Sequence, residues 1–325
     1  MRSPDAGSVG RVLVFPMSGY INRLQALASS LILAEDLGAD FSFCWIPFRY
    51  VPGPATDTLG AGFCDRYELA PEWSVEHYSI DVDTVPRYVT RSPDGRWIGL
   101  RGHDRGEQAL VPELEAAIRA QGHVELVVAV AGGTFRLDTS QAGSERFLER
   151  KRDFYRALPL HEGIESTVRD VLAEQPGPYL GLHLRYTDRG HQAPLPRDIR
   201  AALVTAADRT GLARVFVASD TARHRDRWHD EVRSLGLEPW SIDHPVLDRE
   251  DPASAHAALI DWRLLGHARR LVYFAESSYA TEAAVAAGAW STSVALRPHR
   301  GRAAAVQVRD LASAAWFKVT GSRPT

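Results

Sequence analysis

The chain has 325 residues, which suits two α/β domains of roughly 150 residues each better than one small core. With 45% apolar residues, 24% charged residues and a net charge of −3, the composition excludes a nucleic-acid binder that relies on a basic surface. Two cysteines, Cys44 and Cys64, are too few for a disulfide framework or a cysteine-based zinc site, and we expect a cytoplasmic protein.

The first half of the chain predicts alternating strands and helices, because short β-branched runs alternate with segments of helical apolar period. We expect a strand over 11–15, a helix over 22–37 ended by Gly38, a strand over 41–46, a helix over 110–120, a strand over 124–130 and a helix over 144–158. Residues 51–105 are rich in Pro, Gly and Asp and predict loops and small elements beside the sheet, with a short strand at 96–100. This order is typical of a doubly wound sheet.

The second half predicts another such series, after a helix over 161–174 that ends at Gln175-Pro176-Gly177-Pro178. We expect a strand over 179–184, a helix over 197–210, a strand over 214–218, helices over 222–235 and 256–267, a strand over 270–274, a helix over 281–287, a strand over 292–296 and a last amphipathic helix over 303–317. Such alternation predicts a mostly parallel sheet covered on both faces, with ligands at the carboxyl ends of its strands.

The segment GLHLRYTD over 181–188 carries the strongest chemical pattern. Alternation along the strand places three leucines on one face and His183 and Arg185 on the other, with Asp188 in the loop that follows. A guanidinium has a permanent charge and a bidentate fork, so this arrangement suits a diphosphate. The alternative is an edge strand with a surface Arg–Asp pair.

Polar residues also follow the later strands. Ser277 and Ser278 open a predicted helix, where N–H groups and hydroxyls form an anion cradle, although both serines could be ordinary N-caps. Asp261 lies in an apolar helix, either solvated or aimed at a ligand, and the pair Ser219-Asp220 either faces a ligand or caps the next helix.

The loop after the first strand is a further candidate. Gly19 allows a ligand to approach the backbone closely, and Asn22 either faces that ligand or caps the following helix.

Together these segments resemble the fucosyltransferase superfamily, which includes protein O-fucosyltransferases and α-1,6-fucosyltransferases. The matching patterns are G-x-x-N-R-L at 19–24, H-x-R-x-T-D at 183–188, V-F-V-A-S-D at 215–220, and Asp261 followed by Ser-Ser-Tyr at 277–279. The resemblance implies an α/β GT-B fold with two Rossmann-like domains, an acceptor-side domain over 1–165 and a nucleotide-sugar-binding domain over 166–300. Residues 301–325 would form a helix that packs back on the first domain.

The resemblance also implies a GDP-sugar donor, GDP-fucose, and an inverting reaction without metal or other cofactor. By position, Arg185 would bind the β-phosphate and stabilise the leaving GDP, and His183 and Asp261 would contact the guanosine. The remaining contacts to the nucleotide sugar would come from Gly19, Asn22, Ser219, Ser277, Ser278 and Tyr279.

Two departures from the α-1,6 enzymes bear on catalysis. Tyr186 stands where those enzymes have a second Arg, and residues 189–193 contain no acid that could act as base. The candidates for the base are therefore Asp188, His191 and Glu276, by location, and we place Asp188 and His191 with Arg185 in the catalytic set.

Other functions stay open. Asp81-Val82-Asp83 matches the D-x-D metal motif of other glycosyltransferases, and Trp73, Tyr78 and Trp97 either stack on an acceptor or belong to the core. The chain could be a non-catalytic nucleotide-sugar or glycan-binding protein on the same fold, or use another NDP-sugar. We expect a glycan, peptide or small-molecule acceptor, no nucleic acid, and a soluble bacterial-type enzyme, since no apolar run reaches the roughly 20 residues that span a bilayer.

Overall fold

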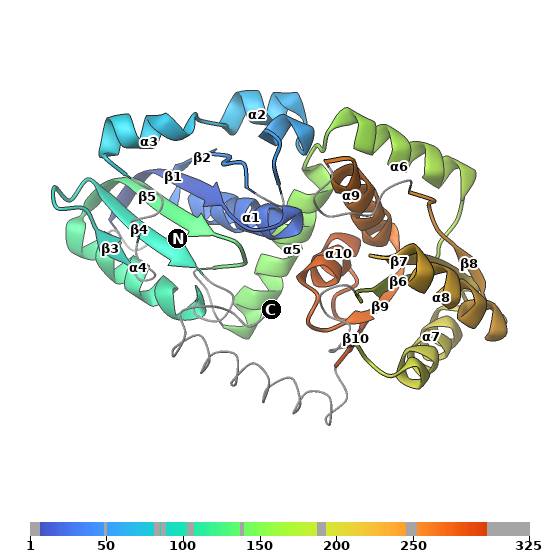
Figure 1. The fold of residues 1–325 in the computed structure, drawn as a ribbon. Coiled ribbons are helices and arrows are strands. Elements are labelled where there is room, and N and C mark those ends of the chain that lie inside the picture. The colour runs from blue at the N-terminus through green and yellow to red at the C-terminus, as the bar shows by residue number, and fades with distance from the viewer. Residues whose placement is uncertain are drawn as a thin grey trace, which may run out of the picture. The chain divides into compact units, whose positions relative to one another are not determined.

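The computed structural model describes residues 7–48, 51–80, 85, 89–102, 107–136, 140–186, 193–244 and 252–297. The chain divides into two compact units, Met1–Val171 with Asp248–Ile260, and Leu172–Leu247 with Asp261–Thr325. Each unit is built on its own five-stranded sheet (Figure 1). The helix predicted over 303–317 lies outside the described residues.

The first sheet has the strand order β2-β1-β5-β4-β3, and all its pairings are parallel except that of β3 with β4. Its strands are β1 (Ser8–Pro16), β2 (Asp40–Phe43), β3 (Thr90–Arg91), β4 (Trp97–Gly102) and β5 (His123–Ala131). The helices of this half are α1 (Tyr20–Leu37), α2 (Ala61–Tyr67), α3 (Pro71–Tyr78), α4 (Glu107–Gln121), α5 (Gln141–Ala157) and α6 (Glu162–Glu174), with a 3-10 turn at Ala55–Asp57.

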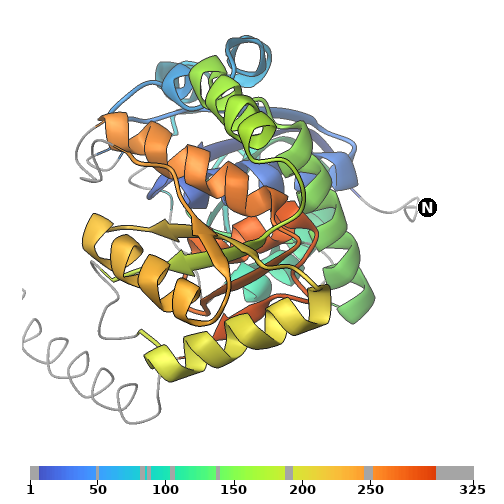
Figure 2. The same cartoon turned by 90° about the vertical axis from the view of Figure 1, so that its right-hand side faces the viewer.

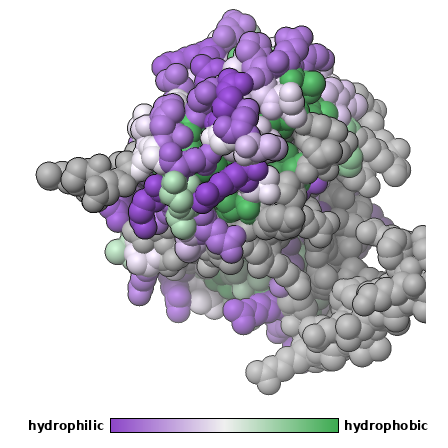
Figure 3. All heavy atoms as spheres, turned by 90° about the vertical axis from the view of Figure 1, so that its left-hand side faces the viewer, coloured by the Kyte–Doolittle hydropathy of each residue, from purple (hydrophilic) through white to green (hydrophobic). Residues whose placement is uncertain are grey.

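The predicted strands and helices of this half are confirmed, and Gly38 ends α1 in the left-handed conformation (φ 60°). The segment 51–105 holds more than was predicted, because it forms α2 and α3 and adds β3 and β4 to the sheet itself (Figure 1). On the side of the molecule shown in Figure 3, hydrophilic side chains cover most of the described surface and hydrophobic ones show only in small areas between them.

The rings of Trp73, Tyr78 and Trp97 pack against the core cluster of the first unit, half-buried. Trp73 stacks on His77 at 5.0 Å between ring centroids, and the guanidinium of Arg96 lies 4.7 Å from the Tyr78 ring. These contacts support the core interpretation of the three rings over stacking on an acceptor.

The second sheet is entirely parallel and has the order β10-β9-β6-β7-β8. Its strands are β6 (Leu180–Leu184), β7 (Arg214–Ser219), β8 (Glu238–Trp240), β9 (Arg270–Phe274) and β10 (Val294–Leu296). Its helices are α7 (Pro196–Thr210), α8 (Ala222–Ser234), α9 (Pro252–His267), whose first part belongs to the first unit, and α10 (Ser278–Ala287). All these elements except the short strand β8 were predicted.

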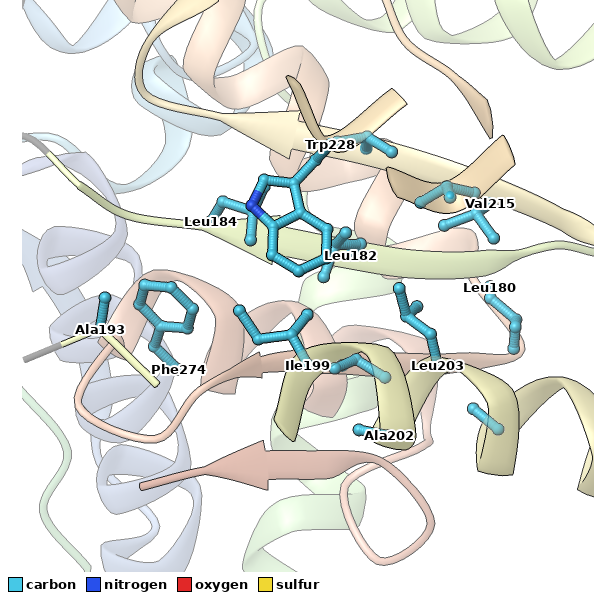
Figure 4. Packing of buried hydrophobic residues seen from close by; sticks show 14 residues of the cluster. Leu180, Leu182, Leu184, Ala193, Ile199, Ala202, Leu203, Val215, Trp228 and Phe274 are labelled. Atoms are coloured by element: carbon cyan, nitrogen blue, oxygen red, sulfur yellow. The ribbon is translucent and has the colours of Figure 1, made fainter. Parts of the chain in front are cut away.

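The central strand β6 is buried on both faces, so the edge-strand alternative for it is wrong. On one face its three leucines pack against α7 and α8, with the indole of Trp228 close to Leu182 and Leu184 (Figure 4). On the other face lies α9, and a Cβ on Gly181 would come within 2.9 Å of Leu265 Cδ2. Figure 2 shows α9 opposite α7 and α8 across this sheet.

Candidate functional site

The strand order of the second sheet marks one place where a ligand is expected. From β6 the chain first adds β7 and β8 on one side, and then returns to add β9 and β10 on the other. The direction therefore reverses between β6 and β9, and open α/β sheets bind ligands at the carboxyl ends of the strands that flank such a reversal. Those ends carry the residues that the motifs single out, Arg185 after β6 and Glu276 to Tyr279 after β9.

His183 is a buried polar residue at this reversal. It is 6% exposed, and its ring stacks on Tyr279 of α10 with centroids 4.7 Å apart and planes 27° from parallel. Its Nδ1 is buried and has no hydrogen-bond partner among the described residues. Burial lowers the pKa of His183 to about 3, with the charge of Asp220 opposing this shift and that of Arg185 adding to it. The ring is therefore neutral at pH 7, and a buried nitrogen is left for a ligand to satisfy.

Arg185 directly follows the last residue of β6 and is half-buried. The backbone next to it is fixed, because the N–H of Tyr186 donates to both carboxylate oxygens of Asp220 at 3.0 Å. Asp220 thus ties the end of β6 to the end of β7. The alternative that Ser219-Asp220 caps α8 is wrong, since Thr221 is the N-cap and its Oγ1 accepts from the N–H of His224.

Tyr186 occupies the core side of the strand end. Its ring stacks on His224 at 3.9 Å and meets Phe274 edge-on at 5.6 Å, and its hydroxyl accepts from Trp228 Nε1 at 3.2 Å. A second arginine at this position would point into the apolar cluster around Trp228. Tyr186 is therefore a packing residue here.

The N-terminus of α10 follows β9 after a short turn. Ser277 is the N-cap, 1% exposed, with its Oγ accepting from the N–H of Ala280 at 3.4 Å, so the capping interpretation holds for this serine. Ser278 and Tyr279 begin the helix and are half-buried, whereas Glu276 is exposed. The free N–H groups of a first helical turn attract anions.

Asp261 lies in α9 and is 9% exposed, so the solvated alternative is wrong. Its Oδ1 accepts a hydrogen bond of 2.8 Å from Nε2 of His244. Burial raises the pKa of Asp261, while His244 and the charge of Arg225 oppose the rise. Sequence reasoning missed His244, because this residue follows β8, the short strand that the sequence did not predict.

The first sheet has an equivalent reversal between β1 and β5, where Gly19 and Asn22 lie. Gly19 is the N-cap of α1, so the alternative that Asn22 caps this helix is wrong. Asn22 Nδ2 instead donates to Ser18 Oγ at 3.0 Å, and a Cβ on Gly19 would meet no atom within 4 Å. Arg23 is fully buried and donates to the carbonyls of Ser18 and Ile46, so this arginine of the motif ties two loops together.

Several predicted residues cannot be placed. Asp188, His191, Asp81 and Asp83 lie outside the described residues. Within the described ranges, no three His, Cys, Asp or Glu side chains are grouped so as to hold a metal ion. None of the described helices is both long and apolar enough to cross a bilayer.

Comparison with known proteins yields structural matches only: no protein-family model matches the chain, and no curated protein matches its sequence significantly. The fold matches a mutant of FUT1 from Arabidopsis thaliana in complex with GDP, with a TM-score of 0.61 and 14% identity over 90% of this chain and 72% of that one. It also matches the α-1,6-fucosyltransferase NodZ, from Bradyrhizobium, co-crystallized with GDP, with a TM-score of 0.52 and 17% identity over 85% of this chain and 92% of that one. NodZ soaked with GDP-fucose matches with a TM-score of 0.51 and 16% identity over 86% and 92% of the two chains. The chain shares its fold with these fucosyltransferases.

Proposed function

We propose that the chain is a glycosyltransferase that moves a sugar, fucose from GDP-fucose, to a hydroxyl of its acceptor, with inversion and without a metal. The observation that carries this proposal is the buried Nδ1 of His183, which has no hydrogen-bond partner in the described part of the chain, beside Arg185 at the reversal of an all-parallel sheet. The fold supports it, because NodZ, with the same fold, has been co-crystallized with GDP and soaked with GDP-fucose. The proposed arrangement is GT-B, with the second unit on the nucleotide and the first on the acceptor.

Different side chains would hold the nucleoside and the diphosphate of the donor. A carboxylate at Asp261 accepts N–H donors from a guanine edge, and the neutral imidazole of His183 forms one hydrogen bond to the nucleoside. The diphosphate would meet the guanidinium of Arg185 and the first N–H groups of α10, with Ser278 beside them.

The chemistry that follows is a single displacement. The acceptor oxygen attacks the anomeric carbon while the bond to the diphosphate breaks, and negative charge grows on the leaving oxygen. Arg185 would stabilise that charge, and a base would take the acceptor's proton. Asp188, His191 and Glu276 remain the candidates for the base, and Gly19 with Asn22 would line the acceptor side.

The test is GDP release from GDP-fucose in the presence of an acceptor panel. We expect Arg185→Ala to slow transfer by about 100- to 1000-fold. Arg185→Lys keeps the charge but loses the fork, and should recover only part of the rate. Arg209→Ala, at an exposed position of α7, is the matched control and should leave the rate unchanged.

Three results would change the proposal. Tight GDP binding without turnover on any acceptor would indicate the non-catalytic binding protein. Turnover with another NDP-sugar in a donor screen would correct the donor. A large loss of activity in EDTA would bring Asp81 and Asp83 into the site.

A further inference from the structure

The four residues after β8, 241–244, are held against β7 and α8 by several hydrogen bonds. Ser241 Oγ donates to the carbonyl of Val217 at 2.7 Å and forms a hydrogen bond with Nε2 of His229 at 2.6 Å. The guanidinium of Arg225 donates to the carbonyl of Ile242 and to Asp243 Oδ1, both at 3.1 Å. This short segment is fixed along its length, so the next side chain, His244, has a defined position.

His244 uses that position to contact Asp261. The two side chains are 8% and 12% exposed and share the 2.8 Å hydrogen bond from Nε2 to Oδ1. This hydrogen bond fixes the orientation of the carboxylate and, with it, the position of Oδ2.

We propose that His244 is a positioning residue for Asp261, which orients this carboxylate through the 2.8 Å hydrogen bond and thereby sets a preference for guanine over purines that lack the 2-amino group. The inference rests on the proposed function, since it assumes that a nucleoside diphosphate binds at this site.

The chemistry of the base explains the expected selectivity. Guanine presents two neighbouring donors, N1–H and the 2-amino group, which match the two oxygens of a carboxylate. Each oxygen has about two lone-pair sites, so Oδ1 can accept from His244 and from the base together. Hypoxanthine keeps N1–H but lacks the 2-amino group and forms one of the two bonds. A protonated Asp261 would offer a donor of its own and would lose this match.

The charges around Asp261 set the pH at which its carboxylate takes up a proton and its hydrogen-bond match to guanine is lost. Burial raises the pKa of Asp261; His244, from the segment after β8, and Arg225, from α8, oppose the rise. Tyr279, from α10, has a pKa held well above its usual range by burial and by the charge of Asp261, so it stays neutral. Removing His244 takes away the main opposing group. The pKa of Asp261 then rises further, and base recognition fails at a higher pH.

The experiment is calorimetric binding of GDP and inosine 5′-diphosphate to the full chain, repeated at a series of pH values from about 8 down to about 5. We expect the wild type to bind GDP about 10-fold more tightly than inosine 5′-diphosphate, since one hydrogen bond to a charged group is lost. In His244→Leu this preference should fall below about 3-fold, and GDP affinity should begin to decrease at a higher pH than in the wild type.

His244→Gln places an amide donor near the position of Nε2 and should restore the preference. His77→Leu, on α3 of the first unit, is the control and should match the wild type.

The outcomes separate the two proposals. A wild type that binds no nucleoside diphosphate would overturn the proposed function and this inference with it. A wild type that prefers GDP, with His244→Leu keeping the same preference and the same pH dependence, would overturn the inference alone. If His244→Leu fails to fold, His244→Asn replaces it, because its shorter side chain cannot bring an amide to Oδ1, and it must lose the preference that His244→Gln keeps.

Discussion

At the scale of single residues, the burial of His183 has a consequence for stability. Its pKa is about 3 in the folded chain and about 6.5 when unfolded, so between these values the unfolded chain binds a proton that the folded chain does not. Stability therefore decreases as the pH falls through this window, by up to about 1.4 kcal/mol per pH unit.

The measurement compares the unfolding free energy of the wild type with that of His183→Gln, whose side chain does not titrate. We expect the wild type to lose more stability than the variant between about pH 6.5 and pH 4.5. Parallel pH profiles for the two proteins would mean that His183 is accessible to protons in the folded state.

Residue periodicity also shows the limit of sequence reasoning at this scale. Alternation along a strand was enough to place His183 opposite the leucines of β6, and the same alternation puts Tyr186 on the leucine side. The approach of His244 to Asp261 could not be predicted, because it depends on how β8, α8 and α9 pack in three dimensions.

At the scale of elements, the contact between β6 and α9 depends on Gly181. A Cβ there would come within 2.9 Å of Leu265 and within 3.2 Å of Ala268 and Leu271. Gly181→Val should therefore push the strand away from the helix and cost about 1–3 kcal/mol of unfolding free energy. Since His183 lies two residues further on, GDP binding should weaken as well.

The control is Gly19→Ala, at the N-cap of α1. This glycine has an ordinary φ of −73° and no atom within 4 Å of an added Cβ, so the substitution should cost less than Gly181→Val, only the weaker N-cap preference of Ala. Chemical denaturation of both variants provides the comparison. Equal stability of the two variants would show that β6 and α9 can separate at little cost.

The elements themselves were predictable to different degrees. A long buried strand such as β5 is predicted by its apolar run, and a helix such as α1 by its apolar period and the glycine that ends it. The helices α2 and α3 span only seven and eight residues, which is shorter than the window of roughly 11 residues or more over which a helical period is recognised. The strands β3 and β8 are shorter still and are defined by the neighbour with which they pair.

At the scale of the whole molecule, each unit has its own sheet and its own core cluster, and the two clusters share no residue. This arrangement predicts that the units respond separately to core mutations. Leu182→Ala in β6 and Leu126→Ala in β5 form a matched pair, since both leucines are fully buried in a sheet. Each substitution should cost about 2–5 kcal/mol, and only in its own unit.

GDP would then distinguish the two variants. At about 100 times its Kd, a ligand stabilises the unit that binds it by about 2.7 kcal/mol. GDP should therefore offset much of the loss in Leu182→Ala and little of that in Leu126→Ala. Hydrogen exchange read by mass spectrometry should show slower exchange with GDP in β6, β9 and α10, and unchanged exchange in β1 and β5. Two results would contradict separate units: GDP slows exchange equally in both sheets, and GDP restores equal stability to both variants. The chain would then be one cooperative structure in which either core supports the nucleotide site.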